Sequence, residues 1–169
     1  IEIFRTSALP SAVLQPLGVS DIALRAMASM ARTGDDIIAR KKIDMVFIST
    51  TAFMSMRLGI RWLRRFGTPF VLDFQDPWFT APPSSIPHRR QGLKHQFMRR
   101  MHALAEARSV PQASGLIAVS EAYLEALREA YPALVNVPSE TIPFGYSAAD
   151  FDVANELGEP WRPFAVSEP

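Results

Sequence analysis

The amino-acid sequence alternates short apolar runs with longer segments of helical periodicity, and no other feature limits the possible folds as strongly. We expect strands over residues 43–49, 70–74, 115–119 and 141–144. The run at 43–49 shows no alternation of polar and apolar residues. This predicts a strand that is buried on both faces, as in a parallel sheet.

Helical periodicity occupies the stretches before and between these runs. We expect helices over residues 20–34 (with Ser20 as the N-cap), 35–41, 52–66, 88–110 and 120–131. Gly67 and Pro69 should end the third of these helices. The fourth is predicted to turn four apolar residues inward, namely Leu93, Phe97, Met101 and Leu104, and four polar residues outward, namely His95, Arg99, His102 and Glu106.

This order of elements predicts βαβ units and therefore an α/β fold. We expect a Rossmann-like three-layer sandwich with a mostly parallel sheet that is covered on both faces. Ligands bind such sheets beyond the carboxyl ends of the strands. Several candidate site residues follow the ends of the predicted strands and should lie at that edge. They are Thr50, Thr51, Asp73, Asp76, Trp78, Ser120, Glu121 and Gly145.

Asp73 and Asp76 stand three residues apart where the second strand passes into a loop. A carboxylate in such a place can act as a general base or bind sugar hydroxyls, and Trp78 offers a ring that can stack on a sugar. The alternative is that either aspartate binds backbone N–H groups of the loop. Phe74 and Gln75 separate the pair, so it is not the Asp-x-Asp of metal-bridged phosphate sites, and we predict no bound metal.

Thr50, Thr51 and Ser120 come at expected helix N-termini, where free N–H groups and the helix dipole favour anions. Each of the three is either a simple helix cap or a ligand contact. The chain has neither Gly-x-Gly-x-x-Gly nor Gly-x-x-x-x-Gly-Lys-Ser/Thr, which argues against a dinucleotide enzyme and a P-loop enzyme. We expect no cofactor.

Charge is unevenly distributed, although the 169 residues carry a net charge of only +1. Residues 57–108 hold ten Arg and Lys against three carboxylates, whereas residues 109–169 hold two against nine. Nucleic acid is not expected as a partner, because clustered RNA-binding motifs are absent and the second of these stretches is acidic.

Four arginines share one face of the expected 52–66 helix, and these are Arg57, Arg61, Arg64 and Arg65. This stripe is either a solvated surface or a contact for anionic lipid headgroups, with Leu58 and Trp62 as interfacial anchors. The sequence leaves both interpretations open.

Composition excludes further classes of protein. The chain has no cysteine, so a disulfide scaffold, a thiolate nucleophile and a Cys-ligated metal are ruled out. No apolar run approaches the ~18–20 residues of a membrane span. His95 and His102 are seven residues apart, whereas helical metal sites prefer a spacing of three or four, so we interpret them as part of a solvated face.

Four segments in order carry a resemblance to a known family. They read DMVFIST at 44–50, PFVLDFQDPW at 69–78, GLIAVS at 115–120 and TIPFGYSAADF at 141–151. Together they resemble the N-terminal domain of a GT-B glycosyltransferase of the family 4 type. The resemblance implies one half of a GT-B architecture, with residues 1–150 as the Rossmann-like domain and 151–169 as a linker or the start of a C-terminal domain.

The resemblance implies transfer of a sugar from a nucleotide-sugar to a saccharide or lipid-linked acceptor, with retention of configuration and without a metal. The N-terminal domain of such enzymes holds mostly the acceptor, and the C-terminal domain holds mostly the nucleotide-sugar. We expect a catalytic role for Asp76, and substrate binding by Asp73, Trp78, Thr50, Thr51, Ser120, Glu121 and Gly145. A φ above zero is expected at Gly145. The expected location is cytoplasmic, peripheral on the inner face of the membrane.

Three positions depart from the family pattern. Gln75 replaces the usual Arg, Phe144 the usual Asn and Ser147 the usual Asp. These replacements argue against the family's usual nucleotide contacts near the hinge. We expect the 169-residue chain alone to lack transferase activity, because a donor domain is needed. The alternatives are a non-catalytic ligand-binding α/β domain and a Mg²⁺-dependent Asp hydrolase.

Overall fold

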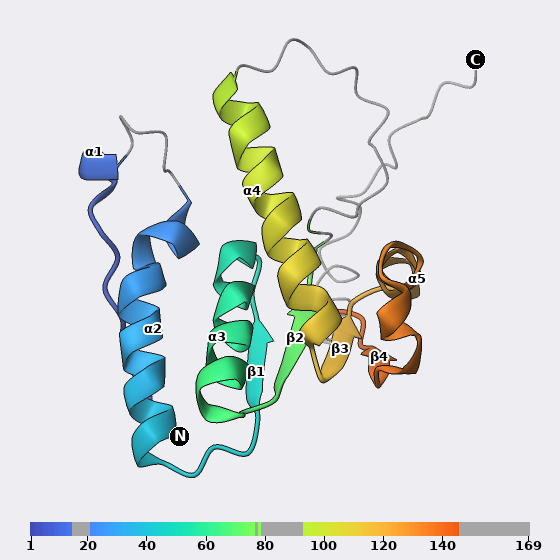
Figure 1. The fold of residues 1–169 in the computed structure, drawn as a ribbon, viewed down its shortest axis with the longest axis horizontal. Helices are drawn as coiled ribbons and strands as arrows, with labels where there is room; N and C mark the ends of the chain where they lie inside the picture. Colours follow the sequence, from blue (N-terminus) through green and yellow to red (C-terminus); the bar gives the residue numbers. More distant parts are fainter. Residues whose placement is uncertain (15–20, 77, 79–92, 146–169) are drawn as a thin grey trace, which may run out of the picture.

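The computed structural model describes residues 1–14, 21–76, 78 and 93–145. Its sheet has four parallel strands in the order β1-β2-β3-β4, with bounds Val46–Ser49, Phe70–Phe74, Gly115–Ala118 and Ser139–Thr141 (Figure 1). The chain therefore has the expected Rossmann-like α/β fold. β4 begins before the expected 141–144 run and shares only Thr141 with it; it ends early because Pro143 has no N–H to donate to a ladder.

Helices connect the strands. They are α1 (Ser11–Leu14), α2 (Ile22–Arg40), α3 (Arg57–Phe66), α4 (Leu93–Ser109) and α5 (Glu121–Ala130), with 3-10 turns η1 (Phe53–Met56), η2 (Val110–Gln112) and η3 (Pro132–Asn136). α3, α4 and α5 each follow one strand and lead to the next, and α2 lies alongside α3 (Figure 1). Residues 88–92 of an expected helix, the side chains of Leu93 and His95, and the expected linker 151–169 lie outside the described residues.

α2 is one continuous helix, and the expected break at Gly34 is wrong. Its N-cap is Asp21, whose Oδ1 accepts hydrogen bonds at 2.7 and 3.3 Å from two backbone N–H groups of the first turn. The expected cap, Ser20, lies outside the described residues. Gly34 is required for packing, because a Cβ there would overlap the indole of Trp62.

The core lies between one face of the sheet and the helices. Phe70, Leu72 and Phe74 of β2 are at most 1% exposed and belong to a cluster that includes residues of α3, β3 and α5. Val71 and Asp73 alternate with them, point to the opposite face and are half-buried. β2 therefore sends apolar side chains to the helices and a carboxylate to the other side.

β1 is not buried on both faces, contrary to expectation. Val46 and Ile48 pack against the core, but Phe47 is 53% exposed and Ser49 is exposed as well. These side chains are exposed because β1 is an edge strand, with no strand beyond it within the described part of the chain.

The inward face of α4 matches the expected one only in part, because Met101 packs against a buried cluster as expected but other residues differ. Phe97 and Leu104 are 62% and 54% exposed, whereas Ala105 and Glu106 are buried. Glu106 can be inside because the hydroxyl of Tyr131 donates to its Oε1 at 2.9 Å. Burial, followed by the charge and the hydrogen bond of Glu106, raises the pKa of Tyr131, so the hydroxyl remains a donor.

α3 ends where the sequence predicts. Gly67 has φ +72°, and its N–H donates to the carbonyl of Leu63 at 2.9 Å. A residue with a Cβ is strained in this left-handed conformation, so glycine suits the position.

Candidate functional site

A hydrogen-bonded cluster of three polar side chains stands at the carboxyl ends of β1 and β2. Ser49 and Asp73 are register partners on neighbouring parallel strands, so their side chains share one face of the sheet. Ser49 Oγ donates to Asp73 Oδ2 at 2.6 Å, and Gln75 Nε2 donates to Ser49 Oγ at 2.8 Å. Gln75 Nε2 also lies 3.5 Å from Asp73 Oδ2. These contacts fix the orientation of the Asp73 carboxylate.

The sequence pattern predicts Asp73 as a site residue but not Ser49, and Gln75 is noted there only as a departure from the family pattern. The register of β1 and β2 is the information that would have identified Ser49. Residues that pair in register on parallel strands point the same way, and Ser49 stands opposite Asp73.

Asp76 follows this cluster at a bend after β2. Its side chain is exposed, and no described residue donates a hydrogen bond to it or forms an ion pair with it. Across the described ranges, neither Asp76 nor Asp73 binds a backbone N–H, so the expected alternative of an Asx-turn is not seen there. A carboxylate in this state can accept a hydrogen bond or a proton from a bound molecule.

Trp78 is anchored in the protein rather than displayed on the surface. Its ring stacks on Phe53, with centroids 5.6 Å apart and an interplanar angle of 10°. Its Nε1 donates to Nδ1 of His102 at 2.9 Å. His102 Nε2 is in turn 3.8 Å from Oδ2 of Asp21, the N-cap of α2.

His102 is consequently not part of a solvated face, contrary to expectation. It ties the loop after β2 to α4 and to the start of α2. Because the ring face of Trp78 against Phe53 is occupied, this geometry supports a role for Trp78 in holding the loop that carries Asp76.

The two threonines after β1 differ. Thr50 Oγ1 accepts a hydrogen bond from the N–H of Ala52 at 2.8 Å, so it acts as a local cap. Thr51 is exposed. Both lie next to Ser49, at the same edge of the sheet as Asp73.

Ser120 and Glu121 begin α5 beyond the end of β3. Ser120 is the N-cap by backbone position, but its side chain makes no capping hydrogen bond. Glu121 accepts from Thr141 Oγ1 at 2.6 Å and from Arg128 Nη1 at 3.0 Å. The hydrogen bond from Thr141 lowers the pKa of Glu121 most, and the hydrogen bond and charge of Arg128 lower it further. Glu121 therefore links α5 to β4.

Gly145 does not have the expected positive φ. Among the described glycines, only Gly67 has one. Gly145 is exposed and a Cβ there would meet no atom within 4 Å, so neither backbone strain nor packing requires glycine at this point.

The comparison with protein families decides what kind of domain this is. A family model described as a glycosyl transferase 4-like domain matches residues 4–145, a range that contains every site residue discussed above. The chain belongs to this family. No curated protein matches the chain significantly.

In this glycosyl transferase 4-like domain, the arginines of α3 fall into two groups. Arg61 binds Asp35 of α2 through two contacts, Nε to Oδ1 at 3.0 Å and Nη2 to Oδ2 at 2.5 Å. Arg65 Nη1 reaches the same Oδ2 at 2.5 Å. Arg57 and Arg64 form no ion pair or side-chain hydrogen bond with the described residues.

Trp62 is not an interfacial anchor, and that prediction is wrong. The side chain is buried at 9% exposure, and its Nε1 donates to Asp35 Oδ1 at 3.2 Å. Leu58, the other expected anchor, is 3% exposed. The hydrogen bond from Arg61 lowers the pKa of Asp35, although burial acts against it, and the charges of Arg61 and Arg65 add to the effect. Asp35 is therefore the ionised centre of the contact between α2 and α3.

None of the described helices is both long and apolar enough to cross a bilayer. Within the same described ranges, no three His, Asp or Glu side chains come together as metal ligands would.

Proposed function

We propose that this domain is the acceptor-binding side of a retaining GT-B glycosyltransferase. Such an enzyme would transfer a sugar from a nucleotide-sugar to a saccharide or lipid-linked acceptor. The observation that carries the proposal is a pair of carboxylates at the carboxyl edge of the sheet in a glycosyl transferase 4-like domain, one held by hydrogen bonds and one exposed and without a partner among the described residues.

The two carboxylates suit different tasks. Asp73 is oriented by Ser49 and Gln75, and a fixed carboxylate is a directional acceptor for a sugar hydroxyl. Asp76 is exposed and without a partner in the described part of the chain, so it is the better candidate for contact with the reacting acceptor. Thr51 and Ser120 would line the same edge.

The donor would be held mainly by a second domain, as in the GT-B arrangement that the sequence resembles. On this proposal the nucleotide-sugar is a co-substrate and no cofactor or metal takes part. The protein would act on the cytoplasmic side, as a peripheral protein at the inner face of the membrane.

The test is sugar transfer by the full-length protein, measured with a panel of nucleotide-sugars and with the membrane and saccharide fraction as acceptor. Asp76→Ala should lower kcat/KM by at least about 100-fold, the size expected when a general base or an equivalent contact is removed. Asp44→Ala is the matched control, because Asp44 is an exposed aspartate before β1, at the amino end of the sheet.

Three results would overturn the proposal. Unchanged transfer by a folded Asp76→Ala variant would remove this loop from the site. Hydrolysis of a generic phosphate ester that EDTA abolishes, without sugar transfer, would instead support an Asp hydrolase. Ligand binding without any turnover of a nucleotide-sugar by the full-length protein would support a non-catalytic domain.

A further inference from the structure

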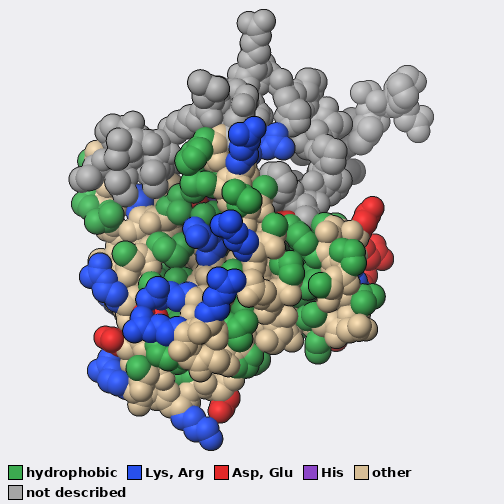
Figure 2. All heavy atoms as spheres, viewed as in Figure 1, with side chains coloured by type: hydrophobic (Ala, Val, Ile, Leu, Met, Phe, Trp, Pro, Cys, Tyr) green, Lys and Arg blue, Asp and Glu red, His purple; other side chains and the backbone are tan. Residues whose placement is uncertain are grey.

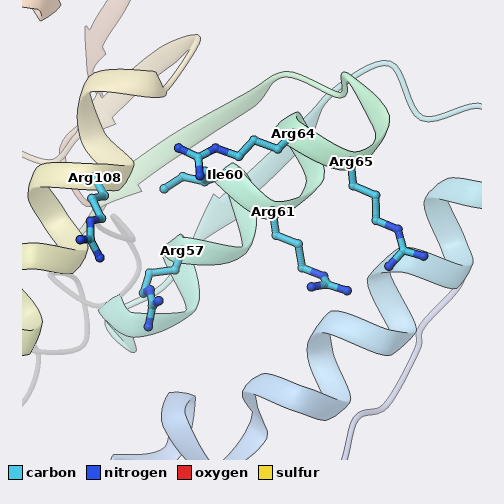
Figure 3. Close-up of a pocket in the computed structure, with 6 residues that line it drawn as sticks. All are labelled: Arg57, Ile60, Arg61, Arg64, Arg65 and Arg108. Carbon is cyan, nitrogen blue, oxygen red and sulfur yellow. The ribbon is translucent and has the colours of Figure 1, made fainter.

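An arginine-lined groove runs between α3 and α4, on the helix layer and away from the strand-end site. It is an open groove of about 730 Å³. Its lining is almost wholly cationic and consists of Arg57, Ile60, Arg61, Arg64, Arg65 and Arg108 (Figure 3). Among the described residues no carboxylate belongs to the lining, so we expect the groove to have a positive potential.

The five arginines do not have the same neighbours. Figure 3 shows Arg61 and Arg65 reaching toward α2, where Asp35 binds them. Arg57, Arg64 and Arg108 are exposed, and none forms an ion pair or side-chain hydrogen bond with a described residue. Three guanidinium groups in one groove therefore have no protein partner among the described residues that would compete with an anion. The guanidinium fork matches the geometry of phosphate oxygens.

An exposed apolar stripe on α4 adjoins the groove. Phe97, Leu104 and Arg108 are separated by seven and four residues, so they fall within about 40° of one another around the helix. Phe97 and Leu104 are more than half exposed. Figure 2 looks onto this face and shows Lys and Arg side chains gathered over α3 and α4, with hydrophobic side chains among them.

We propose that the groove between α3 and α4 binds the phosphate groups of anionic lipid headgroups and that the Phe97–Leu104 stripe enters the adjoining interface. Cationic side chains beside exposed apolar ones are what an anionic lipid surface selects. A nucleic acid would use the arginines but gain little from two apolar side chains on a helix. This inference deepens the peripheral membrane location given in the proposed function, and it does not rest on sugar transfer, because the groove lies on a different face from the strand-end site.

Flotation of the 169-residue chain with lipid vesicles tests this directly. Vesicles of phosphatidylcholine with about 30% phosphatidylglycerol should bind the chain, and vesicles of phosphatidylcholine alone should not. Raising NaCl from about 0.05 to about 0.5 M should weaken binding, because salt screens exposed charges. Absence of binding at low salt, or binding indifferent to salt, would overturn the proposal.

Arginine variants locate the site. The triple variant Arg57→Gln, Arg64→Gln and Arg108→Gln should lose about fivefold in affinity for each arginine and about a hundredfold in total. The matched control is Arg32→Gln, Arg40→Gln and Lys42→Gln, which removes the same charge from exposed positions that do not line the groove. An equal loss in the control would show dependence on net charge alone and contradict a groove site. Circular dichroism should show both variants folded.

Two further arms separate lipid from other phosphate sources. Phe97→Ser with Leu104→Ser should weaken vesicle binding about tenfold and leave its salt dependence unchanged. If the chain binds inorganic triphosphate or a short RNA through the same arginines but not vesicles, the lipid assignment is overturned.

Discussion

The two edges of the arginine face of α3 carry the same residue type but have different neighbours. On the side facing α2, Arg61 and Arg65 share one carboxylate of Asp35, whose side chain is 11% exposed. On the side facing α4, Arg57 and Arg64 have no partner in the described part of the chain. The first pair holds two helices together, and the second pair is the one that we propose to bind anionic lipid.

The comparison shows that the partner, not the arginine, determines the role. Asp35 lies 26 residues from Arg61 in the sequence, so a helical wheel of α3 alone cannot separate the two pairs. The position of Asp35 also explains why Trp62 is buried, because the indole Nε1 donates a hydrogen bond to the same carboxylate. Three variants test how far this contrast extends.

The largest effect should come from Trp62. Trp62→Ala removes a buried indole that packs against Gly34 and donates to Asp35, so we expect the free energy of unfolding to fall by about 3–5 kcal/mol. Urea denaturation measures this. Arg57→Ala, on the same helix, is the control and should change stability by less than about 0.5 kcal/mol. A loss below about 1 kcal/mol for Trp62→Ala would mean that the indole is not part of the core.

Asp35→Asn should have the next largest effect, and it should depend on pH. At pH 7 we expect a loss of about 2 kcal/mol, because charge-assisted hydrogen bonds from Arg61 and Arg65 are weakened. The folded pKa of Asp35 lies below the unfolded value of about 3.9. The stabilisation is therefore complete above that unfolded value and is lost as the pH falls through the folded pKa.

Urea denaturation of both proteins between pH 7 and pH 2.5 checks the sign. The difference in stability between wild type and Asp35→Asn should be constant from neutral pH to about pH 5 and shrink below it. A difference that grows on acidification would contradict an ionised Asp35.

The smallest effect is expected at Arg128, which is paired like Arg61 but at the surface. Glu121, its partner, has a side chain that is 56% exposed, and water screens such a pair. Arg128→Gln should therefore cost about 0.5 kcal/mol by urea denaturation. A loss as large as that of Asp35→Asn would show that burial of the carboxylate is not what separates strong from weak pairs here.

The sequence predicts the parallel strands and their polar carboxyl edge because both depend on local pattern. β2 matches its expected bounds, since the apolar run is flanked by Pro69 and by the Asp76 loop. The inward face of α4 could not be predicted in this way. Phe97 and Leu104 look like core residues, but the buried position goes to Glu106, whose partner Tyr131 lies 25 residues away.

The location of the candidate site could be predicted from the sequence, but the contacts that hold its side chains could not. The edge that carries Asp73 and Asp76 follows from the rule for parallel sheets. The side chains at that edge are held by hydrogen bonds between distant segments, namely Ser49 with Asp73 and Trp78 with His102. Neither contact has a sequence pattern of its own.

The central claim is that the partnered arginines hold the fold and the free ones bind a surface. The most direct measurement is a paired one, thermal stability and anionic-vesicle binding, on Asp35→Asn and on Arg57→Gln with Arg64→Gln. We predict a crossed result. Asp35→Asn should lose stability without weaker vesicle binding, whereas the arginine pair should keep its stability and lose about 25-fold in binding. Loss of vesicle binding in Asp35→Asn, or full binding by the folded arginine variant, would contradict the account.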